Sequence, residues 1–343
     1  MSFSVYRKIA NLILLLVASN LSAQVTYYDA AEFQLLGKAT AATTERYVRL
    51  PDSLEHISRL PLWQLSRNSS GMAVRFRSNS TQVAVKWESL VNFHMDHMTD
   101  VAVKGLDLYC LEGKNWYFVN SARPMGKSTE SSLISGMEAK EREFMIYLPL
   151  YDGLVSLSIG IDAGASINQP AIESPVREKP VVFYGTSISR RLNRECINLG
   201  FSGNAFLDLG VAQVMAGVDA GVFVLDFVPN VTVEQMNERM EKFYRILRDR
   251  HPHTPVIFIE DPQFMDSYYN NANARKIKTL NDTLRRIFNE LKKGKEKNIY
   301  YISSKRMLGS DREATVDGIH FTDVGMMRYA DLVTPVIKKL LKK

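Results

Sequence analysis

The chain has 343 residues, of which 45% are hydrophobic and 23% are charged, a composition that is ordinary for folded globular proteins and excludes fibrous and disordered classes. Its formal net charge is +6, but part of this excess lies in lysines at 292–297 and 338–343, with no aromatic residues between them to stack on bases. We therefore expect no nucleic-acid partner. The length allows two domains.

Residues 1–23 have the pattern of a secretory signal peptide. Arg7 and Lys8 precede an apolar stretch at 9–18, and small residues at 19–23 offer a cleavage site. The apolar stretch is shorter than the roughly 20 residues that span a bilayer. We therefore predict that the mature chain is exported, to the periplasm or the medium, and does not insert into a membrane once the signal is removed.

Residues 24–172 show the alternation of apolar and polar side chains that is typical of half-buried strands. The pattern is clear at 72–77, 82–87, 107–110, 116–119, 143–148 and 155–160, with polar turns between these segments. This spacing predicts a β-sandwich domain, which could bind carbohydrate or pack against a neighbouring domain. Cys110 falls in this domain and Cys196 falls beyond it, so a disulfide between them is not favoured.

A segment with three prolines, Pro170, Pro175 and Pro180, predicts a linker with a boundary near residue 172. Beyond it, from 173 to 343, apolar runs alternate with amphipathic ones, which predicts a doubly wound parallel α/β sheet. The expected strands are 181–184, 196–199, 221–227, 255–260 and 298–302. The expected helices are 205–216, 232–250, 272–292 and 323–342.

The first of these strands ends in Gly185-Thr-Ser187. Ligands of open α/β sheets bind at the carboxyl ends of the strands, so Ser187 is a candidate nucleophile. An ordinary turn at the end of a strand is the alternative interpretation. Near the end of the chain, Asp317 precedes His320 by three residues. Because a serine nucleophile needs a base that is itself oriented by a third group, this pair suits such a serine. The segment also fits a lead-in to the last helix, with Thr322 or Asp323 as N-cap.

Two further segments follow the second and third predicted strands. Gly203 lies in Gly-Phe-Ser-Gly-Asn (200–204), and Asn230 follows Pro229. The backbone N–H of Gly203 and the side-chain amide of Asn230 are candidate donors for an oxyanion. A plain turn at 203–204 and a simple strand end at 229–230 are the alternatives.

These four segments, in this order, resemble the SGNH (GDSL-type) hydrolases, which are named after a serine, a glycine, an asparagine and a histidine. The matching residues are Ser187, Gly203, Asn230 and His320, the last with Asp317. Residues 105–109, Gly-Leu-Asp-Leu-Tyr, are similar to the Gly-x-Asp-Leu-Tyr signature of a β-domain that often precedes such a hydrolase. The resemblance covers nearly all of the predicted mature chain. It implies hydrolysis of acyl esters, often acetyl groups on carbohydrates, without metal or organic cofactor.

The resemblance also implies a mechanism. His320 would take the proton of Ser187 as the hydroxyl attacks an ester carbonyl, and Asp317 would orient the imidazole. The N–H groups of Ser187 and Gly203 and the amide of Asn230 would form the oxyanion hole. His320 would then activate water to release the acid. The implied partner is an acylated carbohydrate or another small ester.

The connection after Ser187 departs from the family pattern. Only eight residues, 188–195, separate it from the strand at Cys196, whereas a parallel crossover normally takes a dozen or more. A catalytically impaired glycan-binding protein on the same fold is therefore an alternative function. Hydrolysis of amide or thioester bonds by the same groups is a third. The sequence leaves the oligomeric state open.

Two pairs of histidines stand outside these segments, at 94 and 97 and at 251 and 253. Neither has further ligands at zinc spacing, so we predict no metal site. An alternative for His94 and His97 is that they reach the hydrolase site from the neighbouring domain. Asp226, inside an apolar strand, is predicted to be a buried structural group, and Glu260 and Asp261 end the next strand on the same edge.

Overall fold

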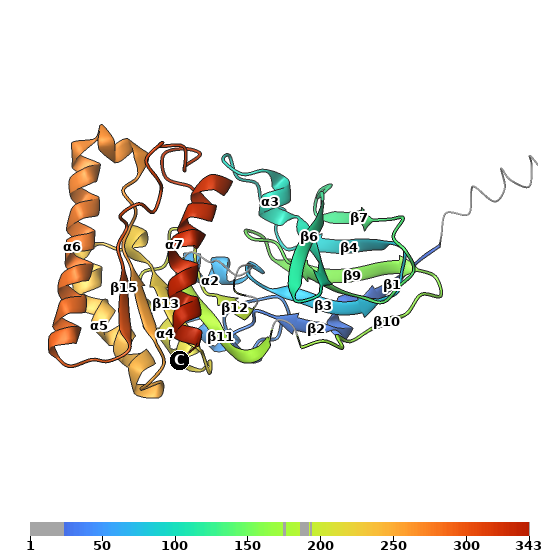
Figure 1. Ribbon diagram of the computed structural model, residues 1–343, viewed down its shortest axis with the longest axis horizontal. Helices are drawn as coiled ribbons and strands as arrows, with labels where there is room; N and C mark the ends of the chain where they lie inside the picture. The colour runs from blue at the N-terminus through green and yellow to red at the C-terminus, as the bar shows by residue number, and fades with distance from the viewer. Residues whose placement is uncertain (1–23, 174–175, 186–191, 193, 343) are drawn as a thin grey trace, which may run out of the picture.

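The computed structural model describes residues 24–173, 176–185, 192 and 194–342. The predicted signal peptide and Ser187 lie outside these residues. Figure 1 shows two parts side by side along the long axis, an antiparallel half formed early in the chain and a parallel half that ends with α7 (Asp323–Leu341). The predicted fold class, an all-β domain followed by a parallel α/β domain, is confirmed.

The antiparallel half consists of two sheets. One has the strand order β1-β9-β4-β7, and the other has the order β10-β3-β8-β5-β6 with β2 beside β3. The strands are β1 (Val25–Asp29), β2 (Gln34–Leu36), β3 (Ala73–Ser78), β4 (Val83–Ser89), β5 (Leu106–Glu112), β6 (Asn115–Ala122), β7 (Ser128–Ile134), β8 (Arg142–Tyr147), β9 (Leu154–Asp162) and β10 (Ile167–Asn168).

The two sheets share one core. Val85 and Ile159 from the first sheet and Phe76 and Phe144 from the second are fully buried in it. Alternation along β4 explains why, because Val85 points inward while Lys86 is exposed. The alternating segments therefore predict this sandwich, whereas β1, β2, β7 and β10 were not predicted.

The parallel half has the strand order β12-β11-β13-β14-β15, and every pair is parallel. The strands are β11 (Val176–Gly185), β12 (Arg194–Asn198), β13 (Val222–Asp226), β14 (Val256–Ile259) and β15 (Ile299–Ile302). Eight residues, 186–193, connect β11 to β12, so the short connection is compatible with a parallel pair. Leu192, the described residue of this connection, is buried in the core beneath α7.

Helices cover both faces of this sheet. One face packs against α4 (Leu209–Ala216), α5 (Val233–Arg250) and α6 (Asn271–Lys293), and the opposite face packs against α7. The predicted start of α4 at residue 205 is wrong. Leu207 has a positive φ of 58°, which an α-helix does not allow, and the helix begins only after Asp208.

Among the described residues before the predicted linker, two segments form short α-helices, α2 (Leu60–Ser66) and α3 (Asp100–Lys104). Leu62 and Trp63 of α2 are buried in the core of the parallel half. Arg49, also buried, donates to the carbonyls of Asn198 and Gly200 of that half. The two halves are thus joined by apolar packing and by a buried guanidinium. The boundary near residue 172 stays a prediction.

Candidate active site

The carboxyl ends of three neighbouring strands form one edge of the parallel sheet. Phe183 of β11 lies opposite Asn198 of β12, and Gly185 lies opposite Asp226 of β13. The chain segments that carry Ser187, Gly203 and Asn230 all leave the sheet at this edge, within a few residues of those positions. Ser187 itself lies outside the described residues, two positions after Gly185.

Gly185 fits a site where no side chain has room. Its φ is +119°, and a Cβ atom there would lie 1.9 Å from the carbonyl oxygen of Asp226. On the other side of β11, a Cβ atom at Gly200 would lie 1.7 Å from the carbonyl oxygen of Gly185. The exit of β11 toward Ser187 is therefore held tightly between its two neighbours, because both contacts require glycine.

Asp317 and His320 lie in a compact loop that leads into α7. Thr315 and Phe321 form an isolated antiparallel bridge, and the N–H of Val316 donates to the carbonyl of His320 at 2.7 Å. Gly318 takes a φ of +93° at the turn. The N-cap of α7 is Thr322, whose Oγ1 accepts from the N–H of Gly325.

The two side chains bond to each other across this loop. Asp317 Oδ2 lies 2.6 Å from His320 Nδ1, and Asp317 Oδ1 accepts the backbone N–H groups of Ile319 and His320 at 3.0 and 2.8 Å. These hydrogen bonds hold the pKa of Asp317 far below its usual value, so the carboxylate stays charged. Since a carboxylate only accepts hydrogen bonds, Nδ1 carries a proton, and in the neutral imidazole Nε2 is then the nitrogen with the lone pair.

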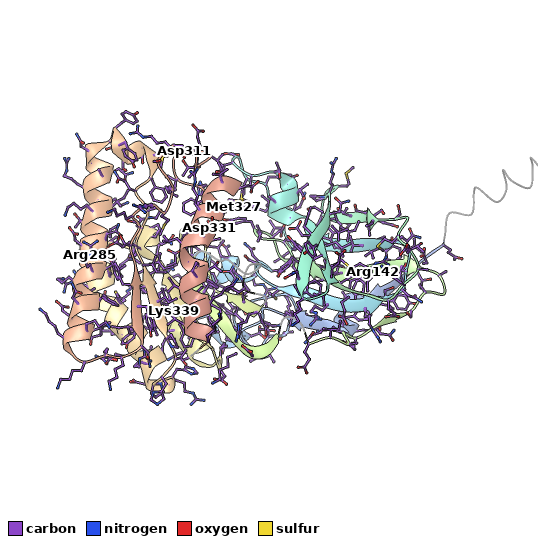
Figure 2. The ribbon with its side chains drawn as sticks, viewed as in Figure 1. Arg142, Arg285, Asp311, Met327, Asp331 and Lys339 are labelled. Atoms are coloured by element: carbon purple, nitrogen blue, oxygen red, sulfur yellow. The ribbon has the colours of Figure 1, made fainter. Side chains whose placement is uncertain are left out.

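A buried hydrogen bond ties α7 to the same edge of the sheet. Tyr329, in the second turn of α7, donates its hydroxyl to Asp226 Oδ2. Asp226 is buried, as predicted. The start of α7, and with it the loop that carries His320, is thereby held near the end of β13. Figure 2 marks Met327 near this end of α7 and Lys339 toward the other.

The acidic residues at the end of β14 differ from each other. Glu260 is a satisfied structural group that accepts from Tyr301 Oη at 2.6 Å and from the N–H of Ser304 at 2.8 Å. Asp261 is buried, and its Oδ1 has no hydrogen-bond partner among the described residues. Burial, reinforced by the charge of Asp226, raises the pKa of Asp261 to about 8. Asp261 is therefore mainly protonated near neutral pH.

The two candidate oxyanion donors lie in the segments that follow β12 and β13. Gly203 is exposed, with a φ of +64°, in a turn closed by the hydrogen bond from Asn204 N–H to the carbonyl of Phe201. No atom lies within 4 Å of where its Cβ would be. Asn230 ends a single 3-10 turn, Val228–Asn230, directly after β13, and is half-buried. Their role in catalysis stays a prediction.

From the sequence, a contact of His94 and His97 with the hydrolase site was only an alternative, and for His97 the structure shows such a contact. Its imidazole stacks on that of His320, with ring centroids 4.0 Å apart and planes 16° from parallel. His94 does not reach His320 and instead bonds Asp100 through Nδ1 at 2.8 Å. Of His94 and His97, the second therefore contacts the candidate active site.

His97, Asp317 and His320 bring possible metal-ligand atoms within 4.8 Å of one another. A histidine nitrogen, however, binds a metal in the plane of its ring. Two rings stacked face to face at 4.0 Å cannot both direct a lone pair at one ion. We therefore interpret the contact as ring stacking rather than a metal site.

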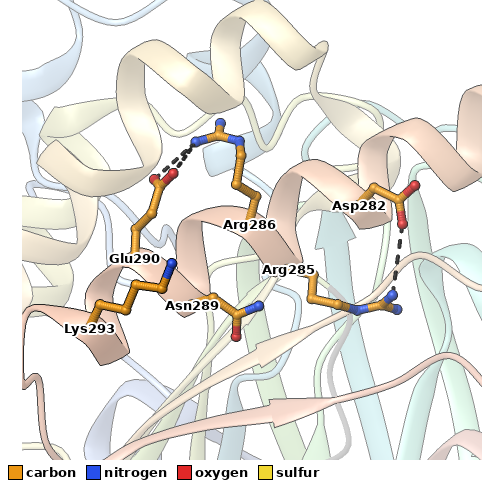
Figure 3. A pocket seen from close by; sticks show the side chains of 6 residues that line it. All are labelled: Asp282, Arg285, Arg286, Asn289, Glu290 and Lys293. Atoms are coloured by element: carbon orange, nitrogen blue, oxygen red, sulfur yellow. Dashed lines mark hydrogen bonds and ion pairs between the residues drawn. The ribbon is translucent and has the colours of Figure 1, made fainter.

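Two hollows on the described surface lie away from these residues. One, of about 330 Å³, runs along the outer side of α6. It is lined by side chains that largely pair with each other, such as Arg286 with Glu290 (Figure 3). Another, of about 260 Å³, lies where Leu54 and Leu62 meet the start of α4. Neither is lined by a candidate site residue.

Comparison with known families accounts for both halves of the chain. The model of the GDSL-like lipase/acylhydrolase family matches residues 163–338. A model described as the N-terminus of SGNH-hydrolase-type esterases, named GxDLY, matches residues 25–167. The chain belongs to the GDSL-like lipase/acylhydrolase family. The resemblance drawn from Ser187, Gly203, Asn230, Asp317 and His320 is confirmed at the level of the family.

Solved structures agree with this assignment. A protein described as a GDSL-like lipase from Bacteroides ovatus ATCC 8483 is 34% identical, covers 93% of this chain and 98% of its own, and superposes with a TM-score of 0.87. The salicylyl-acyltransferase SsfX3 is 16% identical, over 93% and 95% of the two chains, with a TM-score of 0.71. A family two carbohydrate esterase from Cellvibrio japonicus is 10% identical, over 93% and 98%, with a TM-score of 0.56. The last two show the fold alone.

A search of curated proteins gave no match. Within the part of the chain that the structure describes, no helix is both long and apolar enough to cross a bilayer. Cys110 and Cys196 are both buried, as thiols rather than as a disulfide. Membership of the GDSL-like family supports ester hydrolysis as the general class of activity.

Proposed function

We propose that this protein is an exported serine esterase that removes acyl groups, acetyl foremost, from carbohydrates or similar small esters. Ser187 is the nucleophile, His320 is the general base, and Asp317 orients the base. One observation carries the proposal: the 2.6 Å bond between Asp317 and His320, in a loop held at the edge of the sheet from which β11 leads to Ser187.

In this mechanism His320 Nε2 takes the proton of the Ser187 hydroxyl as its oxygen attacks the ester carbonyl. The negative oxygen of the tetrahedral intermediate is held by the N–H groups of Ser187 and Gly203 and by the Asn230 amide. Protonated His320 then gives its proton to the leaving alcohol. Water, activated by His320, attacks the acyl-enzyme, and the acid leaves with Ser187 restored.

The choice of a carbohydrate ester rests on similarity of fold. A family two carbohydrate esterase from Clostridium thermocellum, solved in complex with cellohexaose, superposes over 80% of this chain with a TM-score of 0.51 at 12% identity. Export rests on the signal-like pattern of residues 1–23.

The test compares the hydrolysis of p-nitrophenyl acetate and of acetylated oligosaccharides by the wild type, Ser187→Ala and Ser189→Ala. We expect Ser187→Ala to lower kcat by about 10⁴-fold or more. Ser189→Ala, a matched change two residues away, should leave kcat within a few-fold. Equal rates for the wild type and Ser187→Ala would remove Ser187 from the mechanism.

A second candidate is a glycan-binding protein without turnover. The observation that favours it is the connection of only eight residues, 186–193, between β11 and β12. This candidate predicts binding of oligosaccharides with the same affinity in the wild type and Ser187→Ala, and no serine-dependent release of acetate. Serine-dependent turnover excludes it.

A further inference from the structure

One loop of the antiparallel half reaches the parallel half. Residues 90–99 connect β4 to α3, and Figure 1 shows this segment directed toward the start of α7. Met95 and Met98 form an isolated bridge, with His97 between them. This tight turn presents the imidazole of His97 to the face of His320.

The beginning of this loop is held by a buried carboxylate. Asp152, which is fully buried, accepts the backbone N–H groups of Val91 at 3.0 Å and Phe93 at 2.9 Å. It comes from the segment that precedes β9, so the anchor belongs to the sandwich rather than to the loop. Hydrogen bonds to a buried charged group are stronger than those between neutral groups. The backbone of the loop is therefore fixed where it leaves the sandwich.

A buried lysine holds the middle of the loop. Lys104, whose side chain is 1% exposed, places Nζ 2.6 Å from Asn92 Oδ1, 3.1 Å from His94 Nε2 and 3.3 Å from Asp100 Oδ2. His94 Nδ1 in turn lies 2.8 Å from Asp100. Since ammonium only donates, His94 accepts at Nε2 and donates from Nδ1. Together these contacts support the turn that carries His97.

The stacking contact of His97 acts on the face of the His320 ring, which the bond to Asp317 does not fix. Asp317 holds the ring through Nδ1, but a single bond at one ring atom leaves the plane of the imidazole free to tilt. The side chain of His320 is 46% exposed, so little else contacts its faces. We propose that His97 is a positioning residue, supplied by the antiparallel half, that fixes the plane of the proposed general base. The inference rests on the proposed function, in which His320 is that base.

The contribution of His97 is its ring face rather than a hydrogen bond. Its Nε2 is buried and has no hydrogen-bond partner among the described residues. An aromatic ring of similar size would therefore preserve the contact, whereas a polar side chain without a ring would not. This difference separates a stacking role from a general need for a polar group at position 97.

The experiment measures kcat and KM for p-nitrophenyl acetate in three variants of the full mature chain. Stacked rings contribute enough to change a rate by about 3- to 10-fold. We expect His97→Ala and His97→Gln to lower kcat by this factor with KM within twofold, and His97→Phe to restore kcat to within twofold of the wild type. Asp96→Ala, at the exposed neighbouring position of the same turn, is the control and should match the wild type.

Unchanged kcat in His97→Ala, or recovery by Gln but not by Phe, would overturn the role of His97. The same assay on Ser187→Ala separates this failure from failure of the proposed function. If Ser187→Ala is inactive while His97→Ala is fully active, only the inference about His97 fails. If Ser187→Ala is fully active, the proposed function fails.

A second measurement does not need activity. In the nuclear magnetic resonance spectrum of Ser187→Ala, the ring protons of His320 experience the ring current of His97. Replacing His97 by Ala in this background should move these resonances downfield, and replacing it by Phe should not. If the His320 resonances are identical in Ser187→Ala with and without His97→Ala, the two rings do not stack in solution. This result would overturn the inference.

Discussion

The two loops that meet at His320 are built in opposite ways. The loop at 314–322 is held by its own atoms, through the Thr315–Phe321 bridge and the bonds that Asp317 makes to residues two and three positions later. The loop at 90–99 is held by buried charges from other segments, Asp152 and Lys104. The first loop can therefore keep its reactive groups exposed, whereas the position of the second depends on the whole sandwich.

The largest effect that we expect is a loss of catalytic rate that leaves the stability of the fold almost unchanged. Asp317→Asn should lower kcat by about 10⁴-fold, because an amide no longer favours the tautomer of His320 with a free Nε2. Since Asp317 is exposed and its partners are local, the melting temperature should change little. Activity assays and thermal unfolding check both parts. Asp323→Asn, in the next turn of the chain, is the control, and a loss of kcat below tenfold in Asp317→Asn would contradict the proposed dyad.

The converse effect is expected at Asp152. In Asp152→Ala the partly buried N–H groups of Val91 and Phe93 and the buried N–H of Gly153 lose their carboxylate acceptor. Each unsatisfied buried donor costs about 1–3 kcal/mol, so the free energy of unfolding should fall by about 3 kcal/mol, measured by urea denaturation. The exposed Asp96→Ala should change it by less than about 0.5 kcal/mol. If the free energy of unfolding of Asp152→Ala decreases by less than about 1 kcal/mol, the loop at 90–99 does not depend on Asp152 for its position.

The same contrast explains what the sequence could and could not predict. Asp317 and His320 are three positions apart, so their pairing is a local property that spacing indicates. The strands of the parallel half were predicted because each contains short apolar sequence near turn residues, most clearly in β13, whose residues are all buried. In both cases the pattern involves residues that are close together in the sequence.

His97 could not be assigned in this way. Its contact with His320 depends on how two domains pack, and a pair of histidines three residues apart is equally consistent with a surface loop. Leu62 and Trp63 present the same difficulty, because they lie in the sequence of the sandwich but are buried in the core of the parallel half. Short strands such as β10 also escape prediction, since two residues carry no alternation.

The exposed Asp317 and the buried Asp261, both in the parallel half, have pKa values shifted in opposite directions. The pKa of exposed Asp317 is lowered by hydrogen bonds, whereas burial raises that of Asp261 to about 8 from its usual 3.8. The folded state thus holds a proton on Asp261 that the unfolded chain releases above pH 4. The free energy of unfolding should therefore fall as pH rises from about 4 to 8, with a slope of up to about 1.4 kcal/mol per pH unit from this group.

Asp261→Asn should remove this contribution, because the amide does not titrate. We expect the change in unfolding free energy between pH 5 and pH 7 to be smaller in the variant by about 2 kcal/mol, measured by urea denaturation at the two values. Asp249→Asn, at an exposed position near the end of α5, should behave as the wild type does. Equal pH dependence in Asp261→Asn and the wild type would mean that Asp261 is ionised in the folded state.

The smallest expected effect tests how self-contained the 314–322 loop is. Thr322 Oγ1 accepts from the N–H of Gly325 at 3.2 Å and donates to the carbonyl of Glu313 at 3.1 Å, so it joins the loop to α7. Thr322→Ala should lower the free energy of unfolding by about 1 kcal/mol, the usual cost of an N-cap, and Thr322→Ser should restore it. Because Asp317 and His320 are held by bonds that do not include Thr322, kcat should stay within a few-fold in both variants. A large loss of kcat in Thr322→Ala that Ser restores would show instead that the start of α7 positions the base, and the loop would then depend on distant contacts as the loop at 90–99 does.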